Sequence, residues 1–312
     1  MQGYSIGGYI NAIARRSVKT MMVEGVNDRS VLNRLKLEKA SVIGHELPGV
    51  IDVADILTGD EVSGLGKKAI IKSVLSALSE TPATVAQKFG TLVDREWDGL
   101  TLDMDLQNPW NAPIQGSPNF ITVGHSVENY FFRLSPIEAF LKQFFSDRLD
   151  QIFFNDLMDR FHSIIGFAVV YSLGMRHIGA ISRADRIINR RLVEWHGDRY
   201  ISTSALNSSL IARGVNAAQN VYLFINSAVA TYLDRFTHSE PGHWLCHGHL
   251  GEQAIWACVA NLAEEHAVPG DVAMQIERGL ADVRFRHCVD YLCRQTAHLS
   301  APLDSAVDWL IA

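Results

Sequence analysis

The chain has 312 residues, 47% of them hydrophobic, and a formal net charge of −6. This composition can bury a large core, in one large domain or two smaller ones, and it excludes a disordered chain. The acidic balance also argues against a protein that coats nucleic acid nonspecifically, because such affinity rests on neutralising phosphates. It does not exclude a nuclease with a local basic groove.

Nothing in the sequence resembles a secretion signal or a membrane span. Residues 1–18 lack a continuous apolar run, and the longest uncharged apolar stretch, residues 161–175, is shorter than a bilayer span. The 4 cysteines form no C-x-x-C pair, so we expect reduced thiols. These features predict a cytoplasmic protein without membrane contact.

The first part of the chain alternates strand and helix patterns. Apolar runs predict strands at 19–23, 41–43, 50–53, 89–93 and 120–123. Helices are predicted at 28–38, with Asp28 as its cap, and at 66–79. Strands separated by helices indicate βαβ crossovers, so the fold class is α/β with a mostly parallel sheet.

After Pro136 the pattern becomes helical. Helices are predicted at 137–148, 151–175, 182–194, 215–235, 251–266 and 284–298. We therefore place a boundary near residue 135, between a domain of residues 1–135 and a mainly α-helical domain of residues 136–312. The clearest loop is 106–119, which contains three prolines and three asparagines.

Acidic residues follow two of the predicted strands. Glu24 and Asp28 follow the run at 21–23, and Asp94, Glu96 and Asp98 follow the run at 91–93. Open α/β sheets place ligand sites at these strand ends. The acids at 94, 96 and 98 alternate along a segment expected to be extended, so period two directs all three to one side. Carboxylates gathered without nearby cations repel one another, and their hard oxygens favour Mg²⁺ or Mn²⁺ over zinc. Asp103 and Asp105 could add ligands, although a solvated loop is the simpler reading.

A third motif, His125-Ser126-Val127-Glu128-Asn129-Tyr130, follows the strand at 120–123. Glu128 could complete a metal shell, and His125 could meet a phosphate or act as an acid. The alternative is a helix start in which Ser126 caps the helix and the Glu128 side chain bonds back to the cap. The two readings are compatible with each other.

These three motifs, in this order along the chain, resemble the TOPRIM fold of topoisomerases, primases and certain nucleases. Their patterns are V-E-G-x-x-D, D-x-(acid)-x-D and H-S-x-E. They are similar to a bacterial TOPRIM-like family that includes the nuclease effector of the PARIS anti-phage system. The resemblance covers roughly residues 19–135 and implies a TOPRIM-like Rossmannoid sheet. It implies catalytic roles for Glu24, Asp94 and Glu96, and metal binding by these acids with Asp98 and Glu128. Glu96 departs from the family, because the second acid of the pair is otherwise an aspartate.

The resemblance also implies a function. It predicts a Mg²⁺-dependent or Mn²⁺-dependent nuclease, a toxic effector that cleaves RNA, with tRNA preferred, or DNA. An ABC-type ATPase partner would restrain it, and a homodimer is a candidate active form. The alternatives are a non-catalytic adaptor that docks on the ATPase and a DNA-directed TOPRIM nuclease. We see neither the tyrosine-bearing gate domain of a topoisomerase nor the zinc module of a primase.

Basic residues and histidines supply candidate substrate contacts. Residues 64–68 do not form a P-loop, because Glu61 and Lys68 break its pattern, but Lys67 could approach a phosphate from a helix start. The histidines at 243–249 lack the usual zinc spacing, and the resemblance instead places His249 at the active site. A basic groove or a solvated face could be formed by the arginines of the predicted helix at 182–194, which include Arg183, Arg186 and Arg190.

Overall fold

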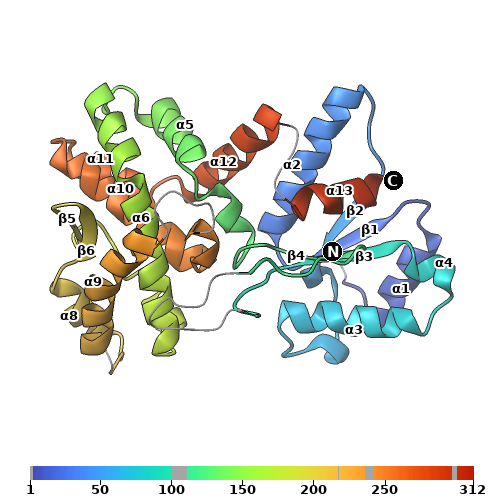
Figure 1. Ribbon diagram of the computed structural model, residues 1–312. Coiled ribbons are helices and arrows are strands. Elements are labelled where there is room, and N and C mark those ends of the chain that lie inside the picture. The colour runs from blue at the N-terminus through green and yellow to red at the C-terminus, as the bar shows by residue number, and fades with distance from the viewer. Residues whose placement is uncertain (1–2, 100–110, 217, 236–241, 297–300) are drawn as a thin grey trace. The chain divides into compact units, whose positions relative to one another are not determined.

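The chain forms two compact units in the computed structural model (Figure 1), which describes residues 3–99, 111–216, 218–235, 242–296 and 301–312. We call them the sheet unit (Met1–Arg95, Ala112–Val123 and Val289–Ala312) and the helical unit (Glu96–Asn111 and Gly124–Cys288). The division differs from a single boundary near residue 135, because the C-terminal segment belongs with the N-terminal sheet.

Four strands form the parallel sheet of the sheet unit. They are β1 (Thr20–Val23), β2 (Val50–Val53), β3 (Phe89–Val93) and β4 (Asn119–Ile121), in the order β2-β1-β3-β4. All three strand pairs are parallel, which confirms the α/β fold class. Met21 and Met22 are both fully buried although their side chains point to opposite faces, so both faces of the sheet are covered.

Helices cover the two faces of this sheet (Figure 1). The helices α1 (Ile6–Arg15) and α3 (Lys67–Ser79) lie on one face, and α2 (Val26–Ile43) and α13 (Leu303–Ile311) lie on the other. Shorter elements are η1 (Ala54–Ile56), η2 (Asp60–Val62) and α4 (Ala83–Ala86). Tyr9 and Ile13 of α1 pack with Ile71 of α3 and with Phe89 of β3.

The predicted strand at 41–43 is wrong. These residues form the last turn of α2, which ends at Ile43, and the C-cap residue Gly44 lies in the left-handed region with φ 83°. The Gly44 amide donates to the Ala40 carbonyl at 2.8 Å, a glycine C-cap that the apolar run Val42-Ile43 does not reveal. Both of these apolar side chains are exposed.

Residues far apart in the sequence join α13 to the rest of the sheet unit. A Cβ atom on Gly90 of β3 would lie 2.7 Å from the Trp309 ring, so the indole packs directly on the glycine. Lys39 of α2 is 8% exposed. Its ammonium group contacts Asp304 and Asp308 of α13, each at 2.8 Å. The sheet therefore depends on a segment that the sequence analysis assigned to the other domain.

The helical unit is built around two long, buried helices. All residues from Ser163 to Met175 of α6 (Gln151–His177) are buried, and so are residues 254–260 of α10 (Gly248–Glu265). The helices α6 and α10 pack together, and α9 (Ala218–Arg235) packs on α6. The remaining elements are η3 (Val127–Phe131), α5 (Leu134–Phe145), α7 (Ile181–Ala184), β5 (Val193–His196), β6 (Arg199–Ser202), α8 (Ala205–Ala212), η4 (Gly242–Leu245), α11 (Gly270–Arg278) and the first part of α12 (Ala281–Thr296).

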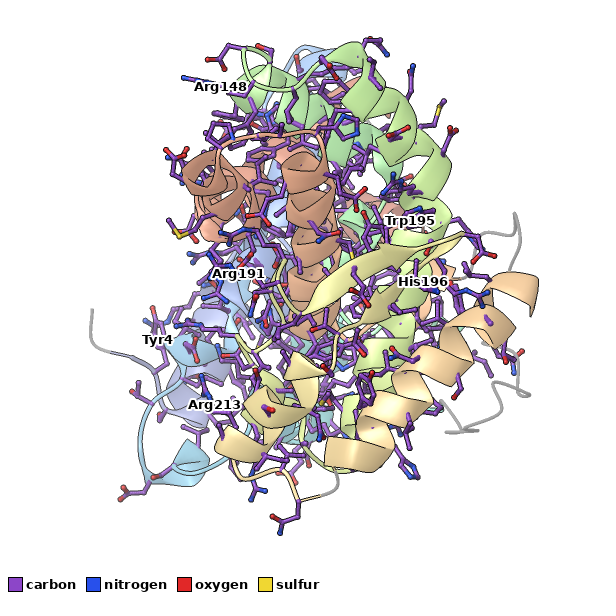
Figure 2. The ribbon with its side chains drawn as sticks, turned by 90° about the vertical axis from the view of Figure 1, so that its left-hand side faces the viewer. Tyr4, Arg148, Arg191, Trp195, His196 and Arg213 are labelled. Carbon is purple, nitrogen blue, oxygen red and sulfur yellow. The ribbon has the colours of Figure 1, made fainter. Side chains whose placement is uncertain are left out.

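The predicted helix at 182–194 is wrong. The helix α7 ends at Ala184, and β5 and β6 form an antiparallel hairpin around Gly197, whose φ is 70°. Figure 2 shows this hairpin with Trp195 and His196. The Arg160 guanidinium lies 4.4 Å from the centre of the Trp195 ring, and this packing helps to hold the strand.

Two smaller expectations can be compared with the structure. None of the described helices is long and apolar enough to cross a membrane. All four cysteines are free and buried, as expected for reduced thiols. Burial raises the pKa of the Cys288 thiol to about 12, so it is a structural rather than a reactive group.

Candidate functional site

The acids that follow β1 and β3 meet at one edge of the parallel sheet. Val23 of β1 pairs with Leu92 of β3, so the carboxyl ends of the two strands are neighbours. Beyond these ends, the Glu24 carboxylate accepts a hydrogen bond from the Asp94 amide at 2.9 Å between Oε1 and N. Both acids are half-buried. The structure therefore places the Glu24 carboxylate against the backbone of Asp94 at the ends of the two strands.

Asp28 orients the chain directly after Glu24. It was expected to be the cap of its helix, but α2 begins two residues earlier, at Val26, with Gly25 as the N-cap. The Asp28 carboxylate reaches back to accept from the Gly25 amide at 2.7 Å. Asp28 is 5% exposed, so its role here is to hold the turn that follows Glu24.

A lysine contacts this acidic edge, but it is Lys68 and not the expected Lys67. The Lys67 ammonium pairs with Asp55 at 2.6 Å and does not approach the acids. Lys68, in the first turn of α3, donates to the Asp94 carbonyl at 3.0 Å. The strand-end site therefore contains its own positive charge, which the expectation of unbalanced acids overlooked.

Residues 94–98 are not extended, so the expectation that their acids share one side is wrong. The strand β3 ends at Val93, and residues 96–99 form a turn. Glu96 lies in the left-handed region with φ 54°. Its amide donates to the His125 carbonyl at 2.7 Å. Alternation is lost at this bend, and the exposed Glu96 and Asp98 belong to the helical unit. Asp103 and Asp105 lie outside the described residues.

The third motif brings aromatic rings together in the helical unit. The His125 ring lies 4.8 Å from the Trp97 ring and 4.2 Å from the His247 ring, measured between centroids. The Arg176 guanidinium lies 4.4 Å from the centre of Trp97. The ring contact of His249 is with His247, at 6.2 Å between the ring centroids. His247 is therefore the histidine that this structure places beside His125.

Glycine at position 248 allows the third motif to pack on the start of α10. A Cβ atom there would lie 2.2 Å from Ser126 Oγ and 3.2 Å from Glu128 Oε2. Glu128 is 7% exposed. The residue that answers the Ser126 cap is Asn129, which accepts from the Ser126 amide at 2.9 Å, so the expected partnership with Glu128 is wrong. Asn129 also donates to the carbonyls of His243 and Cys246.

His247 is neutral at physiological pH. Burial, followed by the charge of His249, lowers its pKa to about 4, although Glu128 and Asp185 act in the opposite direction. His247 is the N-cap of α10, and its Nδ1 accepts from the Leu250 amide at 3.3 Å. A neutral imidazole that accepts at Nδ1 carries its proton on Nε2. His247 was not among the expected site residues, and the signal beside it in the sequence is Gly248, which leaves room for the Ser126 and Glu128 side chains.

The expected metal ligands divide between the two units. Among the described residues, no group of three or more His, Cys, Asp or Glu is arranged to hold a metal ion. The sheet unit offers the carboxylates of Glu24 and Asp94, and the helical unit contains Glu96, Asp98 and Glu128. Mg²⁺ usually takes one or two protein carboxylates and keeps several waters, so the two acids at the strand ends would be enough protein ligands for this ion.

The expected basic helix is replaced by dispersed arginines. Arg190 is 9% exposed and pairs with Glu264 and Glu277, so it is not available to a substrate phosphate. Arg183 donates to the Gly214 carbonyl at 2.9 Å. The Arg186 side chain is 83% exposed, and Arg191 is also exposed (Figure 2). The arginines therefore do not line one helical face.

Comparison with known proteins adds no family to these observations. No protein-family model matches the sequence, and no curated protein matches it.

Proposed function

We propose that this chain is a Mg²⁺-dependent or Mn²⁺-dependent phosphodiesterase that hydrolyses nucleic acid, a nuclease of TOPRIM type. The observation that carries the proposal is the Glu24 carboxylate held by the Asp94 amide at the carboxyl edge of a parallel sheet. Ligand sites of open α/β sheets lie at this edge. Lys68 adds a positive charge beside Asp94 that a polyanionic substrate requires.

The chemistry assigns a separate task to each of these groups. Glu24 and Asp94 would hold the metal ion, which supplies a bound water of lowered pKa and neutralises developing charge. One oxygen of Glu24 is occupied by an amide, so the carboxylate is oriented before substrate arrives. We assign Glu24 to proton transfer or metal binding at the scissile phosphate. Lys68 balances the charge of the acids and would contact a phosphate oxygen.

The substrate and the biological setting follow from the motif resemblance. We propose RNA as the substrate, with tRNA preferred over DNA, and a role as the toxic effector of an anti-phage system. An ABC-type ATPase would restrain the nuclease until infection, and a homodimer would be its active form. The exposed arginines of the helical unit, Arg183, Arg186 and Arg191, would contribute to the RNA surface.

The decisive experiment compares cleavage by the purified chain and by two matched variants. Purified tRNA, mRNA and plasmid are incubated with Mg²⁺ or Mn²⁺, and products are resolved by electrophoresis. Glu24→Gln removes the charge of the strand-end acid and should lower the cleavage rate by about a hundredfold or more. Glu80→Gln makes the same change at an exposed position and should leave the rate unchanged.

Each outcome of this experiment separates the candidates. Cleavage of RNA alone supports the preferred substrate, and cleavage of plasmid alone supports a DNA-directed nuclease. Equal activity of the wild type and Glu24→Gln contradicts the assignment of Glu24. Absence of cleavage together with binding to the ATPase would favour the non-catalytic adaptor.

A further inference from the structure

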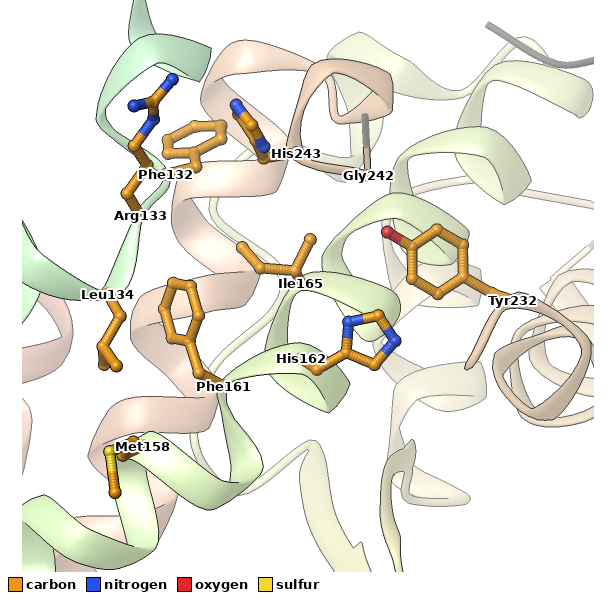
Figure 3. A pocket seen from close by; sticks show the side chains of 10 residues that line it. All are labelled: Phe132, Arg133, Leu134, Met158, Phe161, His162, Ile165, Tyr232, Gly242 and His243. Carbon is orange, nitrogen blue, oxygen red and sulfur yellow. The ribbon is translucent and has the colours of Figure 1, made fainter. Parts of the chain in front are cut away.

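Ring stacking joins two polar side chains that line a cavity of about 420 Å³ in the helical unit (Figure 3). The His162 ring stacks on the Tyr232 ring, with 6.0 Å between the centroids and 26° between the planes. Tyr232 is fully buried, so a ligand in the cavity would not reach its side chain. The edges of the parallel sheet are a clearer candidate surface, because the main-chain groups of a strand have a fixed direction.

The two edge strands of the sheet, β2 and β4, differ in charge. The strand β2 carries Asp52, which is 8% exposed and pairs with Arg16 at 2.6 Å. Charged residues of this kind protect a sheet edge from the addition of a further strand. The strand β4 has no such protection in its sequence, because residues 106–124 contain no Asp, Glu, Lys, Arg or His. Two copies of the chain can therefore meet at β4 without charge repulsion from this segment.

The main-chain groups of Asn119 and Ile121 point away from β3. The Thr122 amide donates to the Val93 carbonyl of β3 at 3.0 Å, so the peptide groups of residue 122 face into the sheet. Successive residues of a strand direct their N–H and C=O groups to alternate sides, so those of Ile121 and Asn119 face the free edge. These are the groups that an added strand would use.

Residues 114–116, which we call the latch, cover this edge. The Gln115 side chain donates to the Ile121 carbonyl at 2.8 Å and accepts from the Ile121 amide at 3.1 Å. The Asn119 amide donates to the Gly116 carbonyl at 2.6 Å. A side-chain amide thus takes the place of a peptide group from a neighbouring strand. All three latch residues are exposed, and Ile114 is 94% exposed, so the latch can leave the edge without opening the core.

The outward groups of β4 are complementary to those of a second copy of the same strand. When two β4 strands pair antiparallel, a two-fold axis at Phe120 sets Asn119 opposite Ile121 of the second copy. Each of these residues offers one donor and one acceptor toward the edge, so every outward group finds a partner. A surface that is complementary to itself in this way forms a two-fold symmetric dimer. A second copy of this chain is therefore the partner that the edge fits.

We propose that Gln115 holds this edge closed, and that opening the latch allows two copies of the chain to join their sheets through β4. The latch and an added strand compete for the same groups of Ile121, so only chains with an open latch can pair. The inference deepens the proposed function, because it assigns a surface to the proposed homodimer. The association is measured without cleavage, so its failure and that of the nuclease assignment are distinguishable.

The first experiment measures self-association of the full chain by analytical ultracentrifugation over a wide range of protein concentration. Gln115→Ala should lower the dimer dissociation constant by about tenfold or more relative to the wild type, because both hydrogen bonds between Gln115 and Ile121 are lost. Gln87→Ala changes another exposed glutamine of the sheet unit and should leave the constant unchanged. Association of Gln115→Ala no stronger than that of the wild type overturns the proposal.

A second variant tests whether the strand edge is the surface that pairs. Ile121→Pro removes the outward N–H, and proline is tolerated in edge strands whose N–H faces away from the sheet. The double variant with Gln115→Ala and Ile121→Pro should therefore associate no more strongly than the wild type, and its thermal unfolding curve shows whether it folds. If the folded double variant dimerises as strongly as Gln115→Ala, the contact lies elsewhere and the proposal is overturned.

Amide hydrogen exchange tests the edge without the proline variant. In Gln115→Ala, the Ile121 amide should exchange faster than in the wild type when the protein is dilute, and it should become protected as the concentration rises. The Thr122 amide, which donates to β3, should be protected at every concentration. Exchange at Ile121 that does not depend on concentration in Gln115→Ala overturns the proposal. So does a wild-type chain in which Ile121 becomes protected by concentration to the same extent.

Discussion

The two units use charged residues in opposite ways. In the sheet unit, Glu24 accepts a hydrogen bond from the Asp94 amide and is half-buried at the edge of the sheet where ligand sites lie. In the helical unit, Arg190 is buried between Glu264 and Glu277, and its charge is neutralised by these two ion pairs. Charge density in the sequence therefore does not identify a site. What distinguishes the two cases is the partner that each charged group finds.

Breaking the buried pair should give the largest change. Arg190→Met removes one of the two arginines that pair with Glu277, whose side chain is 3% exposed, and leaves Arg278 as the other, so we expect a loss of about 3 kcal/mol in unfolding free energy. Urea denaturation monitored by tryptophan fluorescence measures this loss. Arg186→Met, at a side chain that is 83% exposed, should change stability very little. Similar values for the two variants would show that the buried ion pairs of Arg190 contribute little to stability.

The neutral histidines of the helical unit should make its stability depend on pH. The pKa values of His243 and His247 are lowered to about 3 and about 4, so the unfolded chain binds more protons below pH 6.5. Stability should therefore fall as pH drops from about 6.5 to 5, by on the order of 2 kcal/mol for His243 and less for the partly exposed His247.

Thermal melts from pH 7.5 to 5 measure this effect. A variant with both His243→Gln and His247→Gln should lose much of the pH dependence, because neither replacement titrates. His45→Gln removes an exposed histidine from the sheet unit and serves as the control. An unaltered pH slope in the double variant would show that the two imidazoles are not held neutral by burial.

The two neighbouring lysines of α3 sharpen the contrast within the sheet unit. Lys68 contacts the Asp94 carbonyl and Lys67 contacts Asp55. If the strand-end site cleaves phosphodiesters, Lys68→Met should lower the cleavage rate by about tenfold, which corresponds to about 1.4 kcal/mol. Lys67→Met removes the same charge one residue away and should lower it much less. Equal losses would mean that only the net charge matters.

The smallest expected effect concerns Glu96. Its φ of 54° is costly for a residue with a Cβ atom, so Glu96→Gly should be more stable than Glu96→Ala by about 1 kcal/mol. Glu80, at the end of α3, has a right-handed helical backbone with φ −91°, and the same pair of substitutions there should favour alanine. Differential scanning calorimetry compares the four variants. An advantage for alanine at position 96 would contradict the left-handed assignment.

Local patterns in the sequence predicted much of the sheet unit. The strands at 50–53 and 89–93 agree with β2 and β3, because short apolar runs between turn residues suit a sheet buried on both faces. The meeting of Glu24 and Asp94 followed from the parallel order of strands. The end of the extended segment at Val93 could not be predicted in this way, because the turn at Glu96 is held by a hydrogen bond from its amide to the His125 carbonyl, 29 residues later.

Long-range partners explain the other errors. The arginines at 183–191 match a helical pattern locally, yet Arg190 is held by acids more than seventy residues away. The sequence pattern does not distinguish Lys67 from Lys68. Which of the two contacts Asp94 depends on where α3 begins, and it begins at Lys67. His247 lies beside His125 because Gly248, which has no side chain, allows the start of α10 to pack on Ser126 and Glu128.

The packing of α13 on β3 has a consequence for synthesis of the protein. The last strand of the sheet ends at Ile121, but Trp309, which lies on Gly90, follows much later. At ordinary translation rates the ribosome needs roughly 10 to 40 s to make the intervening residues. We expect the sheet to lack part of its cover during this interval, so Glu24 and Asp94 reach their final setting only late in translation. A nascent chain stalled before Leu303 should be cleaved by a protease in the sheet unit, and one extended beyond Ile311 should resist.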